Sequence, residues 1–421
     1  MEDVVSEVRR VIEEAFHHGL GAIDPRVAVR AELESSPIEG PVTLVAIGKA
    51  APAMAHGAID VLDKRVVAGV VVSHGPPPTI DPTDPDPIGT GLSRLQRFEG
   101  GHPVPTQASL LAGRAVMAAA ARATGTLLVL VSGGASSLAE VPVEGLALAD
   151  LATTYRLLIQ SGLPIEKLNT VRRHLSSLKN GGLLSATRAT TVTLLMADVA
   201  GADASVIASG PTLPDSSLPA DALSIVAESG ILESLPAAVV DALRAPPRAP
   251  ESPPPHRWTI VIDGLAAVRA ASTYLRTCGF KTHADPSPLI GDAAEQGRRM
   301  ATAAVASTVT VRHGETVVRV QGEVPGGRNQ HAALSAALAL DGQVSVFAAL
   351  ATDGRDGMTD AAGAIVDGQT CNRMRTSGLD PQDLLAGYRS HEALEASADL
   401  VVCGPTGTNV SDLWMSWRQD P

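Results

Sequence analysis

The residues best suited to bind an anion stand at the ends of apolar runs. Lys49 follows VTLVAIG (residues 42–48), and from a strand end its compact ammonium could reach a phosphate. A surface lysine in a loop is the alternative interpretation. A Walker A site is excluded, because Gly-x4-Gly-Lys-Ser/Thr does not occur in the sequence.

The segment SGGASS (residues 132–137) follows a second apolar run, TLLVLV. Gly133 and Gly134 would let backbone N–H groups point into one concavity, and a helix starting there adds its partial positive charge. This suits a carboxylate or a phosphate. A turn capped by Ser132 or Ser136, with Ser137 beside it, is an equally good interpretation.

Positive charge is concentrated in two further segments. IEKLNTVRRHLSSLKNGG (165–182) carries two of the five lysines of the chain, Lys167 and Lys179, together with Arg172 and Arg173. A solvated helix face is the commoner outcome for such a run. Arg328 follows GEVPGG (322–327), whose glycines would expose backbone amides; a hairpin turn is the alternative.

Carboxylates follow two other apolar runs. Asp198 ends TVTLLMAD (191–198), and Asp353 and Asp356 lie in ATDGRDGMTDAAGAIVDG (351–368). Acids at tight spacing among glycines could hold a divalent cation or act as a base. A structural acidic turn is the alternative, and the spacing differs from that of an EF-hand. GPTGTNVSDL (404–413) could contact a polar ligand through Thr406 and Asn409.

The elements between these segments predict an α/β fold. Apolar runs alternate with helical patterns, as in a largely parallel sheet, and residues 2–20 predict an amphipathic helix. Ligands bind beyond the carboxyl ends of such strands, so the shared placement of the motifs is stronger evidence than any one motif. The proline-rich stretch predicts domains at 1–245 and 258–421, joined by a linker at 246–257.

The composition limits the classes of partner that we expect for this protein. The chain has 421 residues, a net charge of −12 and no basic stripe, so we expect no nucleic acid and no membrane partner. Three widely spaced cysteines predict a reducing, cytoplasmic location. No apolar run approaches the ~20 residues that span a bilayer, and the N-terminus has no apolar signal core.

Together the motifs resemble the two-domain glycerate 2-kinase family with a MOFRL-type C-terminal domain. The matching stretches run in family order from residue 45 to 413, and include VAIGKAA, GGHPVP, VSGGASSL, LNTVRRHLSSLKNGGL, DVAGADASVIASGPT, GETVVRVQGEVPGGRNQ, ATDGRDGMTDAAGAIVDG and GPTGTNVSDL. Ala197 and Ala202 depart from the family pattern, where a serine and an acid are usual.

The resemblance implies a Rossmann-like N-terminal domain, a smaller α/β C-terminal domain and an active site in the cleft between them. It implies ATP-dependent, Mg²⁺-assisted phosphorylation of D-glycerate at its 2-hydroxyl. D-glycerate and ATP are the expected partners, with a homodimer as the assembly to test. The resemblance makes Lys49 and Arg328 the main catalytic pair, with Asp198 and Asp353 as metal or base positions and Asp356 as a further metal ligand. The expected substrate and nucleotide contacts are Ser132, Gly133, Gly134, Ser136, Ser137, Lys167, Asn169, Arg172, Gly210, Glu315, Gly326, Gly327, Asn329, Gln330, Thr406 and Asn409.

Two other functions stay open at this point. One is an NAD(P)H-dependent hydroxypyruvate reductase, a label this family has carried, although the Gly-x-Gly-x-x-Gly fingerprint of dinucleotide sites is missing. The other is a non-catalytic metabolite-binding protein built on the same fold. The catalytic pair and the acidic clusters argue against that reading, because binding alone would not require them.

Overall fold

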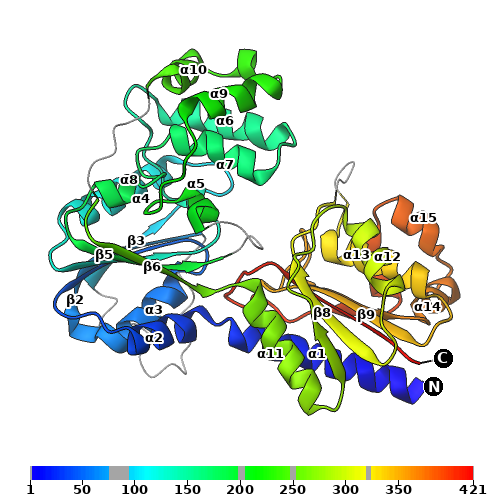
Figure 1. The fold of residues 1–421 in the computed structure, drawn as a ribbon. Helices are drawn as coiled ribbons and strands as arrows, with labels where there is room; N and C mark the ends of the chain where they lie inside the picture. Colours follow the sequence, from blue (N-terminus) through cyan, green and yellow to red (C-terminus); the bar gives the residue numbers. More distant parts are fainter. Residues whose placement is uncertain (1, 75–93, 198–203, 247–252, 319–323, 421) are drawn as a thin grey trace. The chain divides into compact units, whose positions relative to one another are not determined.

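The computed structural model describes residues 2–74, 94–197, 204–246, 253–318 and 324–420. The chain forms two compact units (Figure 1). Over the described residues, the first unit comprises residues 25–197 and 204–261, and the second unit comprises residues 2–24 and 262–420.

The first unit is built on a six-stranded sheet of order β3-β2-β1-β4-β5-β6. Strands β1, β2, β3, β4 and β5 pair in parallel, and β1 and β4 are buried at every position, as expected for central strands covered on both faces. Ile47 at the end of β1 is level with Val72 of β2 and Val131 of β4, so three carboxyl ends meet at one edge. The predicted parallel sheet is confirmed. The strands are β1 (Val42–Ile47), β2 (Val66–Ser73), β3 (Leu95–Glu99), β4 (Thr126–Val131), β5 (Thr190–Met196) and β6 (His256–Ile262).

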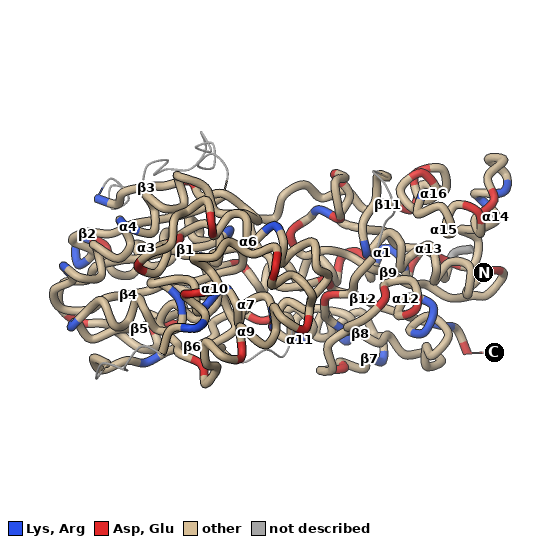
Figure 2. The backbone as a smooth tube through the Cα atoms, turned by 90° about the horizontal axis from the view of Figure 1, so that it is seen from above, with Lys and Arg blue, Asp and Glu red and all other residues tan. Residues whose placement is uncertain are grey.

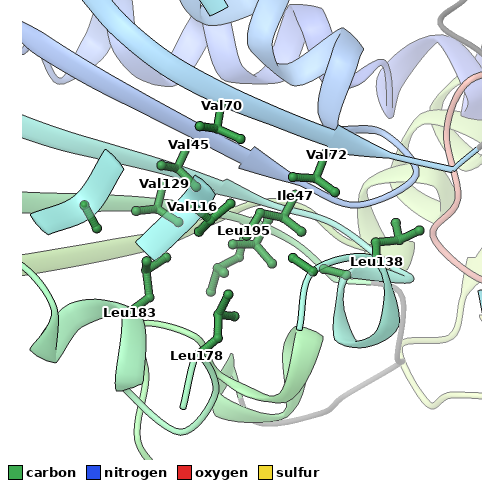
Figure 3. Close-up of a cluster of buried hydrophobic side chains, with 14 of the residues drawn as sticks. Val45, Ile47, Val70, Val72, Val116, Val129, Leu138, Leu178, Leu183 and Leu195 are labelled. Atoms are coloured by element: carbon green, nitrogen blue, oxygen red, sulfur yellow. The ribbon is translucent and has the colours of Figure 1, made fainter. Parts of the chain in front are cut away.

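Helices cover both faces of this sheet (Figure 1). One face carries α2 (Pro25–Ser35) and α3 (Ala51–Leu62), and the other carries α4 (Gln107–Ala121), α5 (Ala135–Leu138) and α8 (Gly182–Ser185). Valine and leucine fill the space between the sheet and the second group, with Val45, Val129 and Leu195 of the sheet facing Val116, Leu138 and Leu183 (Figure 3). A separate helical layer with its own apolar core contains α6 (Leu148–Gln160), α7 (Ile165–His174), α9 (Pro219–Glu228) and α10 (Ala237–Arg244). Short 3₁₀ turns occur at η1 (Asp63–Arg65), η3 (Ala204–Ser209) and η4 (Leu232–Ser234).

The second unit has a mixed sheet of order β11-β10-β9-β12-β8-β7. Among its described strand-to-strand pairings, β7 pairs with β8 in parallel and the others are antiparallel. Phe347 and Trp414 meet edge to face at 5.6 Å in its core. The strands are β7 (Lys281–Ala284), β8 (Thr308–Gly314), β9 (Ser345–Ala351), β10 (Gly363–Asp367), β11 (Leu400–Val401) and β12 (Asp412–Arg418). One face carries α1 (Glu2–Ala22) and α11 (Gly264–Thr277), and the other carries α12 (Ala293–Thr302), α13 (Arg328–Leu340), α14 (Thr370–Thr376) and α15 (Pro381–Ala386) (Figure 1). Helix α16 (Ser390–Ala396) packs against α13.

The compact units divide the chain differently from the predicted domains at both ends of the first one. Helix α1 belongs to the second unit, where Arg9 forms ion pairs of 2.6 and 2.8 Å with Asp367 and Asp399. Strand β6, expected to open the C-terminal domain, completes the first sheet instead. An amphipathic pattern predicts that a helix buries one face, but long-range packing decides against which partner.

Charged side chains are distributed over both units. Figure 2 shows Lys and Arg interspersed with Asp and Glu along the backbone. Among the described residues, none of the helices is both long and apolar enough to span a bilayer.

Candidate active site

The turn after β1 ties three strand ends together. The Lys49 N–H donates to the Gly133 carbonyl at 2.9 Å, and the Ser132 N–H donates to the Ile47 carbonyl at 3.0 Å. Gly48 approaches Ser132 so closely that a Cβ there would overlap the serine side chain. The Lys49 side chain is exposed and forms no ion pair within the described part of the chain. The predicted anion-binding lysine therefore stands at the carboxyl edge of the parallel sheet with its ammonium available.

The serines of the SGGASS segment are engaged with the protein itself. The buried Ser132 hydroxyl accepts a hydrogen bond of 3.1 Å from the Ala50 N–H at the start of α3. Ser136 shares a 2.8 Å hydrogen bond with Ser209, and Ser137 donates to the Gly134 carbonyl at 3.4 Å. Neither Ser132 nor Ser136 caps α5, because its N-cap is Gly134 and no side chain caps it. The two hydroxyls bond to other segments of the chain instead. Among the described residues, no protein acceptor takes a hydrogen bond from the N–H group of Gly133 or Gly134. These two N–H groups can therefore donate hydrogen bonds to a bound anion.

Lys49 and His102 converge over Gly134. This glycine adopts a left-handed conformation (φ 83°), and a Cβ there would lie 3.3 Å from Lys49 Cγ and 3.4 Å from His102 Cδ2. The His102 ring lies 5.8 Å from the His74 ring. Burial, followed by the charges of Lys49, His74 and Arg172, lowers the pKa of His102 to about 4. His102 was not among the predicted site residues, although the GGHPVP motif that contains it was the available signal.

The proximity of His102 to Lys49 gives a pH prediction. We expect the His102 ring to stay neutral from pH 8 down to about 5, because its pKa is about 4. Replacing Lys49 with Met removes a nearby positive charge, so the pKa of His102 should rise toward the ordinary value of about 6.5. NMR titration of the ring protons measures both values. An unchanged pKa in Lys49→Met would contradict the contact over Gly134.

The basic segment of α7 is only partly a solvated face. Lys167 is exposed and lies 3.6 Å from Glu228 of α9, as the solvated-face interpretation expects. That interpretation is wrong for Arg172, Arg173 and Lys179, which are buried. Helix α7 packs beneath η3 and α9, so its inner face cannot reach water.

The buried cations of this segment differ in their partners. Arg173 pairs with Asp215, and Lys179 pairs with Glu140. Arg172 stacks over the Tyr155 ring at 4.5 Å and lies 3.4 Å from the side-chain oxygen of the buried Asn169. The predicted contact Gly210 is a turn residue, whose carbonyl accepts a 2.7 Å hydrogen bond from Gly181.

In the second unit, Arg328 opens α13 and is already held by two carboxylates. Its Nε and Nη2 donate to Asp412 at 2.7 and 3.0 Å, and its Nη1 donates to Glu315 at 2.7 Å. Burial alone would lower the pKa of Arg328, but Asp412 and Glu315 raise it well above its ordinary value. Asp412 is fully buried and orients the guanidinium, whereas Glu315 is 48% exposed. An incoming anion would therefore compete with Glu315. Asp412 was missed, although it lies in the NVSDL segment.

The N-terminus of α13 is capped by Asp356. Its carboxylate accepts hydrogen bonds from the N–H groups of Asn329 (3.1 Å) and Gln330 (2.7 Å). Gly327 lies against this carboxylate so closely that a side chain would overlap it, and Gly326 precedes it. Burial raises the pKa of Asp356 to about 6, although the hydrogen bonds from the two backbone N–H groups lower it. Both carboxylate oxygens are engaged, so the structure gives Asp356 a capping role where a metal-ligand role was predicted.

The side chains of Asn329 and Gln330 have protein partners as well. The Asn329 oxygen accepts a 2.7 Å hydrogen bond from the Trp414 indole, and the Gln330 amide donates to Thr359 at 2.9 Å. Both residues are fully buried. These two side chains therefore have structural roles in the fold, whereas the sequence predicted that they contact a ligand.

Asp353 and the 404–409 loop lie together at the end of β9. One Asp353 oxygen accepts from the Arg355 N–H at 3.0 Å, and the other accepts no hydrogen bond from the described residues. Thr406 donates through its hydroxyl to the Thr352 carbonyl at 2.5 Å, and Asn409 is half-buried further along the loop. Asp198 lies outside the described residues. Within the described part, no three His, Cys, Asp or Glu side chains form a group that could hold a metal.

The cap on α13 yields a stability prediction. Asp356→Ala should lower the free energy of unfolding by about 1–3 kcal/mol, because two buried N–H donors lose their acceptor. Urea unfolding measures this. The matched control is Asp360→Ala on the same loop, where the side chain is exposed and the change should stay within ~0.5 kcal/mol. Equal losses in the two variants would contradict the capping role.

These observations define a two-unit α/β protein with a cationic, glycine-lined sheet edge in one unit and an arginine–carboxylate cluster in the other. Two family models match the chain, "Domain of unknown function (DUF4147)" over residues 11–244 and the MOFRL family over residues 308–412. A D-glycerate 2-kinase of Thermotoga maritima is 36% identical, over 96% of this chain and 97% of its own length. A putative hydroxypyruvate reductase of Agrobacterium vitis is also 36% identical, over 96% of this chain and 93% of its own.

A solved structure agrees with the sequence matches. The crystal structure of a glycerate kinase from Thermotoga maritima superposes with a TM-score of 0.83 at 34% identity, covering 99% of both chains. The chain therefore belongs to the two-domain glycerate 2-kinase family with a MOFRL C-terminal domain.

Proposed function

We propose that this protein is an ATP-dependent kinase that phosphorylates D-glycerate at its 2-hydroxyl, releasing 2-phosphoglycerate and ADP. The observation that carries the proposal is the 36% identity to a D-glycerate 2-kinase over nearly the full length of both chains. The exposed Lys49 beside the free amides of Gly133 and Gly134 supports it, because phosphoryl transfer requires positioning and charge neutralisation more than covalent help.

In the proposed reaction the 2-hydroxyl oxygen attacks the γ-phosphorus, and the bond to the ADP oxygen breaks. An acid, either Asp198 or Asp353, accepts the hydroxyl proton. Lys49 neutralises charge on the transferring group, and the Gly133 and Gly134 amides hold an anionic group of the ligands. Arg328, oriented by Asp412, contributes the second cation once Glu315 is displaced.

Mg²⁺ is part of the proposal. When bound, it would neutralise charge on the nucleotide phosphates. Mg²⁺ usually takes one or two protein carboxylates and completes its shell with phosphates and water. Asp353 fits this pattern because one of its oxygens accepts no hydrogen bond from the described residues. Asp356 does not fit, since both its oxygens accept α13 N–H groups. A cytoplasmic location and a homodimer remain predictions.

Hydroxypyruvate reduction is the second candidate function. A relative at 36% identity carries that name, marked as putative. The glycine turn after β1 reads Gly48-Lys49-Ala50, without the Gly-x-Gly-x-x-Gly pattern that brings backbone close to a dinucleotide pyrophosphate. NAD(P)H oxidation driven by hydroxypyruvate would favour this function.

A coupled assay tests the kinase directly. Purified protein is incubated with ATP, Mg²⁺ and D-glycerate, while ADP release is followed together with the conversion of 2-phosphoglycerate by added enolase. We expect both signals without a phosphoglycerate mutase. ADP release without an enolase signal would contradict the 2-hydroxyl assignment. The absence of glycerate-dependent ADP would contradict the kinase itself.

A further inference from the structure

The Arg172 guanidinium is a buried cation with too few partners. Arg172 is only 7% exposed, and its Nε is buried without a hydrogen-bond partner. Its recorded side-chain hydrogen bond is the long contact of 3.4 Å from Nη1 to the neutral Asn169. No acidic side chain forms an ion pair with it among the described residues. A buried charge without a counter-charge is costly, so this site is suited to an anionic ligand.

The residues beneath Arg172 are hydrogen-bonded to one another, and their charges balance. Arg172 lies 4.5 Å above the ring of Tyr155, whose hydroxyl donates to Glu140 at 2.8 Å. Glu140 also accepts from Lys179 and from Ser176. Because Glu140 and Lys179 cancel each other, the uncompensated positive charge of this buried group is that of Arg172.

Arg172 shares its surroundings with the Lys49 turn. Lys49 and His102 meet over Gly134 of this turn, and the charges of Lys49 and Arg172 both lower the pKa of His102. The Tyr155 hydroxyl also lies 3.5 Å from the Ser136 carbonyl of the glycine turn. The buried Arg172 and the exposed Lys49 therefore lie in one region of the first unit, at the carboxyl edge of its sheet.

We propose that Arg172 binds the carboxylate of the hydroxy-acid substrate, with Tyr155 as the residue that positions the guanidinium. This assignment rests on the proposed function. A planar guanidinium held on an aromatic ring matches a carboxylate that keeps its place during the reaction. The mobile ammonium of Lys49 better suits a phosphoryl group that moves. The substrate class is then a short 2-hydroxy carboxylate, and neutral polyols are excluded because they leave the buried charge unpaired.

Equilibrium binding tests the proposal without relying on turnover. Calorimetry measures the Kd of D-glycerate, of its neutral methyl ester and of ATP for the wild type and for Arg172→Gln. We expect the substitution to weaken D-glycerate binding about 10- to 100-fold, the range for losing a charge-assisted hydrogen bond. The methyl ester should bind both proteins weakly and alike, and the Kd of ATP should stay within about threefold. The matched control is Arg188→Gln, an exposed arginine of the same unit.

The positioning role of Tyr155 has its own readout. Tyr155→Phe keeps the ring beneath the guanidinium and should retain D-glycerate affinity, whereas Tyr155→Leu should lose it while still binding ATP. Circular dichroism confirms that each variant is folded.

Three results would overturn the carboxylate assignment. They are weakened ATP binding in Arg172→Gln with unchanged D-glycerate binding, equal wild-type affinity for D-glycerate and its ester, and no wild-type binding of D-glycerate. Tight D-glycerate binding without ADP release would instead contradict the kinase and leave the assignment intact.

Discussion

Replacing Lys49 with Ala should lower kcat for D-glycerate phosphorylation by about 10²–10³-fold and change KM less, as when one preorganised donor to a developing charge is removed. The side chain is exposed and forms no ion pair among the described residues, so its loss should leave the fold intact. The strand-end turn is held by backbone and Ser132 contacts, which the substitution does not touch. Steady-state kinetics with the enolase-coupled assay gives kcat and KM separately.

Single-turnover measurements give the rate of the chemical step even where product release limits kcat. The matched control is Lys64→Ala in the 3₁₀ turn after α3, an exposed lysine of the same unit that should keep wild-type turnover. A wild-type single-turnover rate in Lys49→Ala would remove Lys49 from the catalytic residues.

Replacing Glu140 with Gln should destabilise the protein by about 3–5 kcal/mol, since it leaves a buried ammonium without its counter-charge. Glu140 and Lys179 are both fully buried, and burial lowers the pKa of Lys179 while Glu140 opposes that effect. The same carboxylate accepts hydrogen bonds from Tyr155 and Ser176, so one substitution weakens several contacts. Urea unfolding at neutral pH measures the loss.

A double-mutant cycle separates the ion pair from the surrounding packing. The variant Glu140→Gln with Lys179→Met should lose much less stability than the sum of the two single variants, because neither charge remains buried alone. Glu228→Gln is the control, since it breaks the exposed pair with Lys167 and should change stability by under ~1 kcal/mol. Additive losses in the cycle would show that the two residues do not stabilise the fold as a pair.

Lys49 and the Glu140–Lys179 pair lie in the same region of the first unit, but Lys49 is exposed and the pair is buried. Lys49 stands on the surface of the sheet edge, so its loss should affect rate rather than stability. Glu140 and Lys179 lie beneath Arg172, and their loss should affect stability and D-glycerate affinity together. A Glu140→Gln variant that stays folded but binds D-glycerate as tightly as the wild type would separate the buried pair from the Arg172 site.

Local sequence patterns were sufficient for the fold class and for the placement of the motifs. The buried strands β1, β4 and β9 coincide with apolar runs, and the polar motifs follow them. Alternation of strand and helix predicts a parallel sheet, and a parallel sheet brings strand ends to one edge. Lys49 beside the Gly133–Gly134 turn was therefore foreseeable from the residues alone.

Tertiary contacts decided which of the candidate side chains are available. Arg172 and Lys167 share one charged run, yet one is buried on an aromatic ring and the other is exposed. Asp356 became a helix cap, and Asp412 became the partner of Arg328, across 84 positions of sequence. Helix α1 joined the second unit although it precedes the first in the chain. Periodicity along a chain reports which face of an element is apolar, but burial and pairing depend on residues far away in sequence, and only the folded structure brings those together.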